Sequence, residues 1–210
     1  MFDDPYYGQS VRAVINQEQP QTPAGLEAVD LGLTSGTKWA NMNVGANAPE
    51  EYGGYYAWGE TEEKDVYEID TYAYYYYQNG DYVNIGDDIA DIAGTKYDVA
   101  TSKWGSDWQM PTNDQIKELL DNTTHTWTTQ NGVNGRLFTG PNGNSIFLPA
   151  AGYRWDEYLY NAGSYGYYWS STQYPSNSYG AYDLSFDSGS ADWDGSYRHF
   201  GFSVRPVVRN

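Results

Sequence analysis

The clearest structural pattern in this chain lies in residues 163–207, which read GSYGYYWSSTQYPSNSYGAYDLSFDSGSADWDGSYRHFGFSVRPV. Apolar or aromatic residues alternate with small polar ones along 182–186 and again along 200–204. A period of two is typical of half-buried strands, and the intervening Gly, Ser, Asn and Asp clusters supply turns. Pro206 has no N–H for a ladder, so it is expected at a sheet edge or at the end of a strand.

The composition of this region indicates a recognition surface. After Glu157 the chain contains no Lys, Glu or Met, whereas Tyr, Ser, Gly, Asn and Asp are abundant. Tyr offers a large amphipathic contact area with few torsions to freeze, and Ser, Gly and Asn offer adaptable hydrogen bonds, as in antibody paratopes. The alternative is that these are simply good strand and turn residues on a solvated sheet.

The whole composition excludes several classes of protein. The chain has 210 residues, enough for one large or two small domains, and its 18% aromatic content argues against disorder despite a mean hydropathy of −0.74. A net charge of −17 makes nucleic acid and anionic membranes poor partners. The absence of Cys excludes disulfides, thiolate metal sites and cysteine nucleophiles. No run is long enough to insert into a membrane, and the acidic start lacks the features of a signal peptide.

Two regions are expected. Residues 1–25 are polar and contain Pro, which is typical of an arm or linker, and residues 26–210 form the domain. Residues 8–14 match residues 201–207 at five of seven positions. The arm is therefore either the end of a preceding copy in a tandem array or a chance match.

The remaining pattern predicts an α+β protein, rich in strands, with one or two short helices and long loops. Strands are expected near 29–33 and 37–40, 55–60, 126–129, 136–139 and 145–149. Residues 61–97 show no clear period, although they hold a Tyr cluster at 72–77. A helical turn is expected over 98–104, and a helix begins after Thr112 as its N-cap and ends near Asn122.

No residue pattern fixes a metal or catalytic site. His125 and His199 are isolated and are interpreted as ordinary surface or turn residues. No cofactor is expected, with calcium as the alternative, because carboxylates can bind it. Asp87, Asp88 and Asp91 are interpreted as solvated acids. Asp192 and Asp194 remain a possible calcium-binding pair. Paired carboxylates of a glycosidase would have to come from Asp156, Glu157, Asp192 and Asp194.

An ordered set of landmarks resembles a known family. They are Tyr56-Ala57-Trp58-Gly59-Glu60-Thr61, Asp98-Val99-Ala100-Thr101 with Trp104-Gly105, Met110-Pro111-Thr112, residues 127–133 (WTTQNGV), residues 147–154 (FLPAAGYR), Tyr168-Trp169-Ser170-Ser171 and residues 201–207 (GFSVRPV). Over residues 26–208 the chain resembles the Fibrobacter succinogenes major paralogous domain family of gut Bacteroidales and their phages. The resemblance implies a C-type lectin-like fold, with small twisted antiparallel sheets and long structured loops.

The chain also resembles the variable proteins of diversity-generating retroelements, which share that fold. In those proteins the C-terminal strands and loops are diversified at adenines, usually in Asn codons, which cannot yield Lys, Glu, Met, Gln or Trp. The lack of Lys, Glu and Met after Glu157 fits this rule, and Trp169, Gln173 and Trp193 would then be fixed. The fold is shared with formylglycine-generating enzymes, whose active-site cysteines this chain lacks. The calcium-binding Glu-Pro-Asn loop of lectins is also missing.

The resemblance and the composition together predict a non-enzymatic receptor or adhesin that binds a surface protein or glycan on a cell surface or phage virion. The expected contact residues are Tyr160, Tyr167, Tyr174, Tyr179, Tyr182, Asp192, Asp194, Tyr197, His199 and Phe200. The expected buried framework is Trp155, Trp169, Trp193, Phe202 and Val204. A structural or carbohydrate-binding module in a tandem array and a glycan-degrading enzyme are the alternatives.

Overall fold

The fold is built mainly from short antiparallel strands. The structure is a computed structural model that describes residues 20–78, 81–83, 85, 89–175 and 179–209. Because it is 37% strand and only 11% helical, the expected α+β class is confirmed. The helices and strands follow one another as β1 (Ala28–Asp30), β2 (Lys38–Ala40), η1 (Ile69–Thr71), β3 (Tyr76–Gln78), β4 (Asp81–Val83), α1 (Val99–Trp104), β5 (Trp108–Gln109), α2 (Asn113–Asn122), β6 (Thr124–Gln130), β7 (Val133–Thr139), β8 (Ser145–Pro149), β9 (Tyr153–Trp155), β10 (Tyr158–Tyr160), β11 (Gly166–Gln173), β12 (Gly180–Phe186), β13 (Ala191–Tyr197) and β14 (Val207–Val208).

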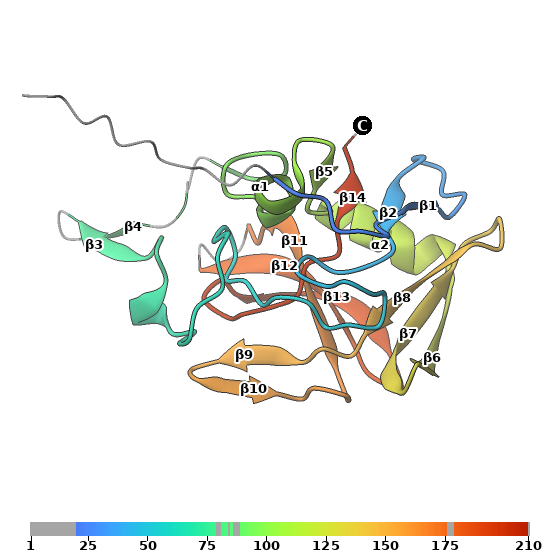
Figure 1. Cartoon of the computed structure of the whole chain (residues 1–210). Helices are drawn as coiled ribbons and strands as arrows, with labels where there is room; N and C mark the ends of the chain where they lie inside the picture. Colours follow the sequence, from blue (N-terminus) through green and yellow to red (C-terminus); the bar gives the residue numbers. More distant parts are fainter. Residues whose placement is uncertain (1–19, 79–80, 84, 86–88, 176–178, 210) are drawn as a thin grey trace, which may run out of the picture.

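One sheet joins distant parts of the chain. Its strand order is β1-β2-β14-β5, so strands from the start and the end of the domain lie side by side (Figure 1). Val207 pairs with Trp39 on one side and with Gln109 on the other. Pro206 lies immediately before β14, at the end of the strand as expected, and its carbonyl accepts a hydrogen bond from the Ala40 amide at 2.8 Å.

The two three-stranded sheets agree with the predicted strands. The order β6-β7-β8 confirms the strands expected within 126–149, and the turn at Asn142-Gly143 places Gly143 at φ 89°, where glycine is favoured. The second sheet has the order β11-β12-β13 and lies at the centre of the molecule in Figure 1. It therefore has neighbours on both faces.

The helices begin where the sequence predicts. The Asp98 carboxylate caps α1 by accepting from the Ala100 and Thr101 amides at 2.9 and 3.2 Å. In α2, Thr112 and Gln115 form a capping box, with Thr112 accepting from the Gln115 amide at 3.2 Å. Helix α2 ends at Asn122, as expected.

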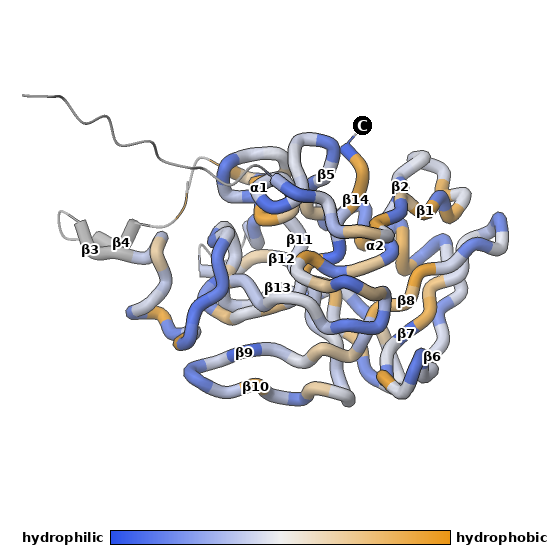
Figure 2. The backbone as a smooth tube through the Cα atoms, in the orientation of Figure 1, coloured by the Kyte–Doolittle hydropathy of each residue, from blue (hydrophilic) through white to orange (hydrophobic). Residues whose placement is uncertain are grey.

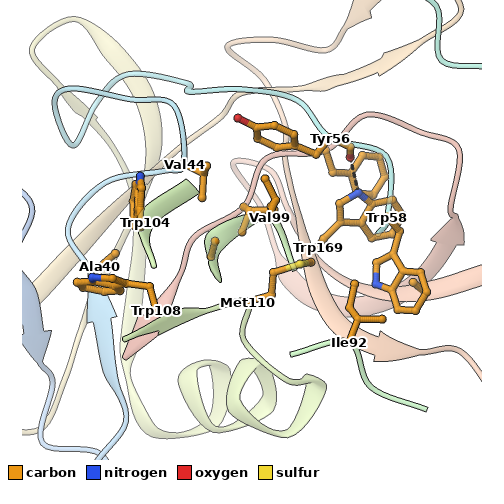
Figure 3. Packing of buried hydrophobic residues seen from close by; sticks show 14 of the residues in the cluster. Ala40, Val44, Tyr56, Trp58, Ile92, Val99, Trp104, Trp108, Met110 and Trp169 are labelled. Atoms are coloured by element: carbon orange, nitrogen blue, oxygen red, sulfur yellow. Dashed lines mark hydrogen bonds between the residues drawn. The ribbon is translucent and has the colours of Figure 1, made fainter. Parts of the chain in front are cut away.

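The central sheet separates two hydrophobic clusters. Trp169 and Ala181 face one cluster, which also contains Trp58 and Phe202 (Figure 3 labels Trp58 and Trp169). The Trp169 indole donates to the Tyr56 carbonyl at 2.8 Å, so a fully buried polar group is satisfied.

The opposite face of the central sheet covers the second cluster. Tyr168, Leu184 and Phe186 from this sheet pack there, together with residues of β2, β8, β14 and α2. Figure 2 shows hydrophobic segments gathered where β2, β8, β14 and α2 meet. The two clusters together give the domain a continuous interior around its central sheet.

Two predicted strands are wrong. Residues 55–60 contain only an isolated bridge, between Tyr56 and Phe202, and residues 200–204 contain isolated bridges at 201–203. The second segment runs between other parts of the chain, so Ser203 and Arg205 are as deeply buried as Phe202. Its alternation of apolar and polar residues therefore does not mark one buried and one exposed face.

The aperiodic segment 61–97 is packed in the part that the structure describes. Tyr67 and Tyr72 are buried in a third cluster with Tyr55. The Tyr72 hydroxyl donates to the Trp58 carbonyl at 2.6 Å, and such bonds replace a regular ladder. Asp87 and Asp88 lie outside the described residues, and so does the predicted match at residues 8–14. Of the predicted arm, residues 20–25 are described, and the Gln21 amide donates to the Lys103 carbonyl at 3.1 Å.

A fully buried guanidinium fixes the C-terminal segment. Arg205 donates to the Asn43 side-chain oxygen at 2.8 Å, to the Ala40 carbonyl at 3.1 Å and to the Phe147 carbonyl at 2.9 Å. Burial lowers the pKa of Arg205 to about 10, so the group is still charged at neutral pH. These bonds tie two separate segments, at residues 40–43 and at Phe147, to one side chain.

We expect Arg205→Met to lower the free energy of unfolding by about 3 kcal/mol or more, because it leaves buried acceptors without donors. Urea denaturation measures the change. Arg209→Met, at an exposed position near the same end of the chain, is the control and should cost no more than about 0.5 kcal/mol. Equal, small losses for both variants would contradict the role given to Arg205.

A buried carboxyl group makes stability depend on pH. Asp183 in β12 is 1% exposed, and its oxygens have no hydrogen-bond partner of good geometry among the described residues. Burial raises the pKa of Asp183 to about 7; the Ser196 hydroxyl opposes this effect and the charge of Asp194 adds to it. Between pH 3.8 and about 7 the folded chain therefore holds a proton that the unfolded chain has released.

The stability contributed by this protonation is present at low pH and is lost as the pH rises through about 7. We expect the free energy of unfolding of Asp183→Asn, measured by urea denaturation, to rise relative to that of the parent by about 3 kcal/mol between pH 5 and pH 8, because the parent keeps losing this stability up to pH 7 or so. Asp192→Asn, an exposed position on the neighbouring strand, should leave the pH dependence unchanged. A parent and Asp183→Asn variant with the same pH dependence would refute the assignment.

Candidate functional site

A protruding hairpin provides one wall of the candidate site. Strands β9 and β10 pair antiparallel, and Asp156 in their connection has a φ of 55°. The backbone of Asp156 exchanges two hydrogen bonds with Tyr67, at 2.9 and 3.2 Å, and Arg154 exchanges two with Gly201, at 2.8 and 2.9 Å. The hairpin is thereby held between the segment 61–75 and the C-terminal segment.

A groove of about 560 Å³ lies beside this hairpin. Its aromatic lining comes from three parts of the chain and consists of Tyr72, Tyr75, Trp155, Tyr179 and Tyr197. Trp155, Tyr179 and Tyr197 expose 45%, 38% and 53% of their surface, which is unusual for rings of this size. We call these three side chains the ring platform.

Other rings support the ring platform from behind. Trp155 packs on Tyr160 and Phe200 with ring centroids 5.9 and 6.2 Å apart, and Tyr197 packs on Phe200 at 5.8 Å. Tyr179 contacts Tyr75 across the groove lining at 5.5 Å. Rings fixed in this way lose little conformational entropy when a ligand binds.

The groove is close to electrically neutral. Burial, reinforced by the charge of Lys64, lowers the pKa of His199 to about 4, so this imidazole is uncharged at neutral pH. Arg198 is buried, donates to the Gly180 carbonyl at 2.9 Å and lies 4.5 Å from the Trp58 ring centroid. Glu68 and Ile69 complete the lining, and Glu68 is exposed.

A second aromatic patch lies on the α2 side of the central sheet. Lys117 of α2 places its Nζ 4.3 Å from the centroid of Trp193, which packs on Tyr182 at 5.6 Å. Tyr182 in turn contacts Tyr174 at 4.9 Å. Gly195 allows this arrangement, because a Cβ there would lie 2.6 Å from the Tyr174 ring. A hollow of about 360 Å³, lined by Tyr174, Tyr197 and Phe200 among others, joins this patch to the groove.

The structure therefore brings together most of the predicted contact residues. Tyr179, Tyr197 and His199 line the groove, Tyr160 and Phe200 support it, and Tyr174 and Tyr182 belong to the second patch. Tyr167 lies behind the hairpin, with its ring 5.2 Å from that of Tyr153.

Two predicted contact residues belong neither to the groove lining nor to the ring contacts of the second patch. Asp192 and Asp194 are exposed on β13, and each carboxylate accepts a hydrogen bond from the following backbone amide, at 2.8 and 2.7 Å. In the described part of the chain, no three His, Asp or Glu side chains are grouped so that they could hold a metal ion. His125 lies in β6 with its Nδ1 2.8 Å from the Arg136 guanidinium.

The predicted framework is correct in part. Trp169, Phe202 and Val204 are buried as expected, but Trp155 and Trp193 are 45% and 39% exposed, so their prediction as buried residues was wrong. Both lie on strands that have solvent on one side. His199 lies in the turn that follows β13, which agrees with its interpretation as a turn residue, and its imidazole is half-buried in the groove lining.

The wall made by residues 68–75 was not predicted from the sequence. Its only signal was the Tyr cluster at 72–77, which has no period that could place it in space. A larger hollow, of about 790 Å³, lies between residues 20–23, 44–47 and α1, and none of the predicted contact residues lines it. Its charged side chains, Lys103 and Glu62, bind each other at 2.7 Å.

Among the helices that the structure describes, none is long and apolar enough to cross a membrane. Comparison with curated proteins and with solved structures gives no match. A family model matches residues 97–207, from just before α1 to β14, which is more than half of the 210 residues. The match includes the ring platform and the second patch but not the wall at residues 68–75. The chain belongs to the family described as Domain of unknown function (DUF8237).

Proposed function

We propose that this chain is a non-enzymatic ligand-binding module of receptor or adhesin type, which binds a surface protein or glycan through its C-terminal aromatic face. The observation that carries the proposal is the ring platform: three large rings exposed around one groove and held in place by further rings. Exposed aromatic side chains with few free torsions are typical of binding surfaces.

The groove supports binding better than hydrolysis. A glycosidase of the common type needs two carboxyl groups on either side of the scissile bond. Of the lining residues that the structure describes, one is a carboxylate, Glu68, and the imidazole of His199 is neutral with a pKa of about 4. Asp192 and Asp194 lie on a strand face away from the groove lining. A glycan-degrading enzyme is therefore the weaker candidate.

We also propose the C-type lectin-like fold and the kinship with retroelement variable proteins. Three features support the fold: small antiparallel sheets, long packed loops, and the pairing of β2 with both β1 and β14, which brings the ends of the domain together. In a diversified surface, Trp155 and Trp193 would be fixed aromatic positions, because Trp is outside the set that mutated Asn codons yield. The variable positions would then be the Tyr, Ser, Asn and Asp residues around them.

A fixed module in a tandem array is the second candidate. It would account for the likeness between residues 8–14 and 201–207. The exposed rings favour a ligand over a purely structural role, since solvent-exposed aromatic side chains contribute little to stability unless something covers them.

The kinship predicts a specific arrangement of the gene. Sequencing the coding region and its flanks should reveal a near-identical template repeat that differs only at adenines, next to a reverse transcriptase gene. The substituted codons should include those of Tyr179 and Tyr197 and exclude those of Trp155 and Trp193. If the flanks contain no such repeat, diversification by a retroelement is rejected, and the chain would be a binding module of fixed sequence.

Binding should depend on the ring platform. With the purified chain on arrays of bacterial surface proteins and glycans, we expect Tyr197→Ala to weaken retention about tenfold, because it removes a supported ring from the groove. Tyr158→Ala is the matched control, since Tyr158 is 59% exposed on the neighbouring β9–β10 hairpin but does not line the groove. Retention of the parent and both variants to the same extent would contradict the assigned surface.

A further inference from the structure

We infer that the groove beside the β9–β10 hairpin binds a neutral saccharide chain and does so without a metal ion. This inference rests on the proposed function, because it names the ligand of the same surface. Three properties of the groove carry it: its size, its charge and the chemistry of its rim.

The size of the groove favours a small ligand over a protein surface. A volume of about 560 Å³ falls within the ~300–1,000 Å³ of small-molecule sites. A stable protein partner would need to cover about 800 Å² of this chain, most of it around a buried centre. The ring platform lines this hollow, and the exposed side chains of Tyr158 and Leu159 on the hairpin lie outside its lining.

The charge of the groove favours a neutral ligand. The described residues of the lining contribute one carboxylate, Glu68, one guanidinium, Arg198, and a neutral imidazole, His199. A sulfated or carboxylated sugar would meet a chain of net charge −17. Arg198, the one Lys or Arg among the described residues of the groove lining, is already bonded to protein carbonyls and lies against Trp58. A quaternary ammonium ligand would gain from the rings but would lie close to that same guanidinium.

The rim combines the two kinds of contact that a sugar ring requires. One face of many pyranose rings carries C–H groups that pack on aromatic faces, and the exposed surfaces of Trp155 and Tyr197 are suited to this contact. Sugar hydroxyl groups at the edge of the ring need donors and acceptors, which Glu68, His199 and the Tyr hydroxyls offer. A purely apolar ligand would leave these polar groups unpaired.

The same lining does not suit a calcium-dependent lectin site. Calcium takes six to eight oxygen ligands, usually with several carboxylates, whereas Glu68 is the one carboxylate among the described residues of the groove lining. Binding should therefore be carried by ring contacts and hydrogen bonds. The ring contacts from Tyr160 and Phe200 already fix Trp155, so that little ordering is required when the ligand arrives.

The test uses isothermal titration of the whole chain with the neutral oligosaccharides cellohexaose, xylohexaose, mannohexaose and laminarihexaose, in buffer with EDTA. We expect at least one to bind, with affinity unchanged when calcium replaces EDTA. Trp155→Ala should weaken binding at least tenfold, and Trp155→Phe should retain part of it. Trp193→Ala is the matched control, since this Trp is exposed to a similar degree (39% against 45%) outside the groove, and it should change affinity less than twofold.

Thermal unfolding of each variant shows whether it is folded. If Trp155→Ala does not fold, the affinity of Trp155→Phe still tests the inference. Binding that needs calcium, equal losses for Trp155→Ala and Trp193→Ala, or no binding of any of the four oligosaccharides would overturn the inference. In the last case the array experiment separates the two proposals. If the chain is retained on a surface protein and this retention depends on Tyr197, the proposed binding module is supported and the saccharide ligand is rejected. If the chain is retained on no protein or glycan, both the binding module and the saccharide ligand are rejected.

Discussion

The buried guanidinium of Arg205 is the interaction on which the rest of the structure depends. Its donors bind the Ala40 and Phe147 carbonyls and the side-chain oxygen of Asn43. Asn43 also donates to the Tyr52 carbonyl at 2.8 Å, so the network reaches the loop that precedes the third cluster. A charge taken out of water is tolerated only when every donor is matched, which ties the C-terminal segment to one position.

From this fixed segment a series of ring contacts leads to the surface. Trp169 stacks on Phe202 at 4.2 Å, Phe202 lies 6.2 Å from Phe200, and Phe200 supports both Trp155 and Tyr197. Each contact is worth about 1 kcal/mol beyond the area that it buries. The exposed rings of the groove are thus the outer members of a packed core and hold their orientation without a ligand.

Much of this architecture was predictable, because the relevant signals are local. The Thr112 cap and the Asn142-Gly143 turn act within a few residues, so the sequence predicts α2 and the β7–β8 hairpin correctly. The period of two fails at residues 200–204, because the chain there is buried on both sides and polar Ser203 and Arg205 are enclosed as well. Alternation of apolar and polar residues predicts which side chains are buried only in a strand that has one face in contact with water.

The candidate site was predictable only on one side. Tyr179, Tyr197 and His199 belong to a C-terminal region whose composition indicates recognition, but the opposite wall at residues 68–75 comes from a segment without a period. Its position depends on long-range bonds such as that from the Tyr72 hydroxyl to the Trp58 carbonyl. The exposure of Trp155 could not be predicted either, because the hydropathy of a residue type does not distinguish an exposed ring from a buried one. Figure 2 shows the β9–β10 hairpin, which carries Trp155, as mostly pale to blue.

The central claim is that a rigid aromatic framework presents one ligand groove, and the indole N–H signals of the eight Trp residues test it directly. Two-dimensional NMR during titration with a neutral oligosaccharide would follow each of them. The account predicts that the Trp155 signal moves with ligand, while the signals of Trp193 and of the buried Trp58 and Trp169 stay in place. Movement of the Trp193 signal with a stationary Trp155 signal, or a general shift of the buried signals, would contradict it.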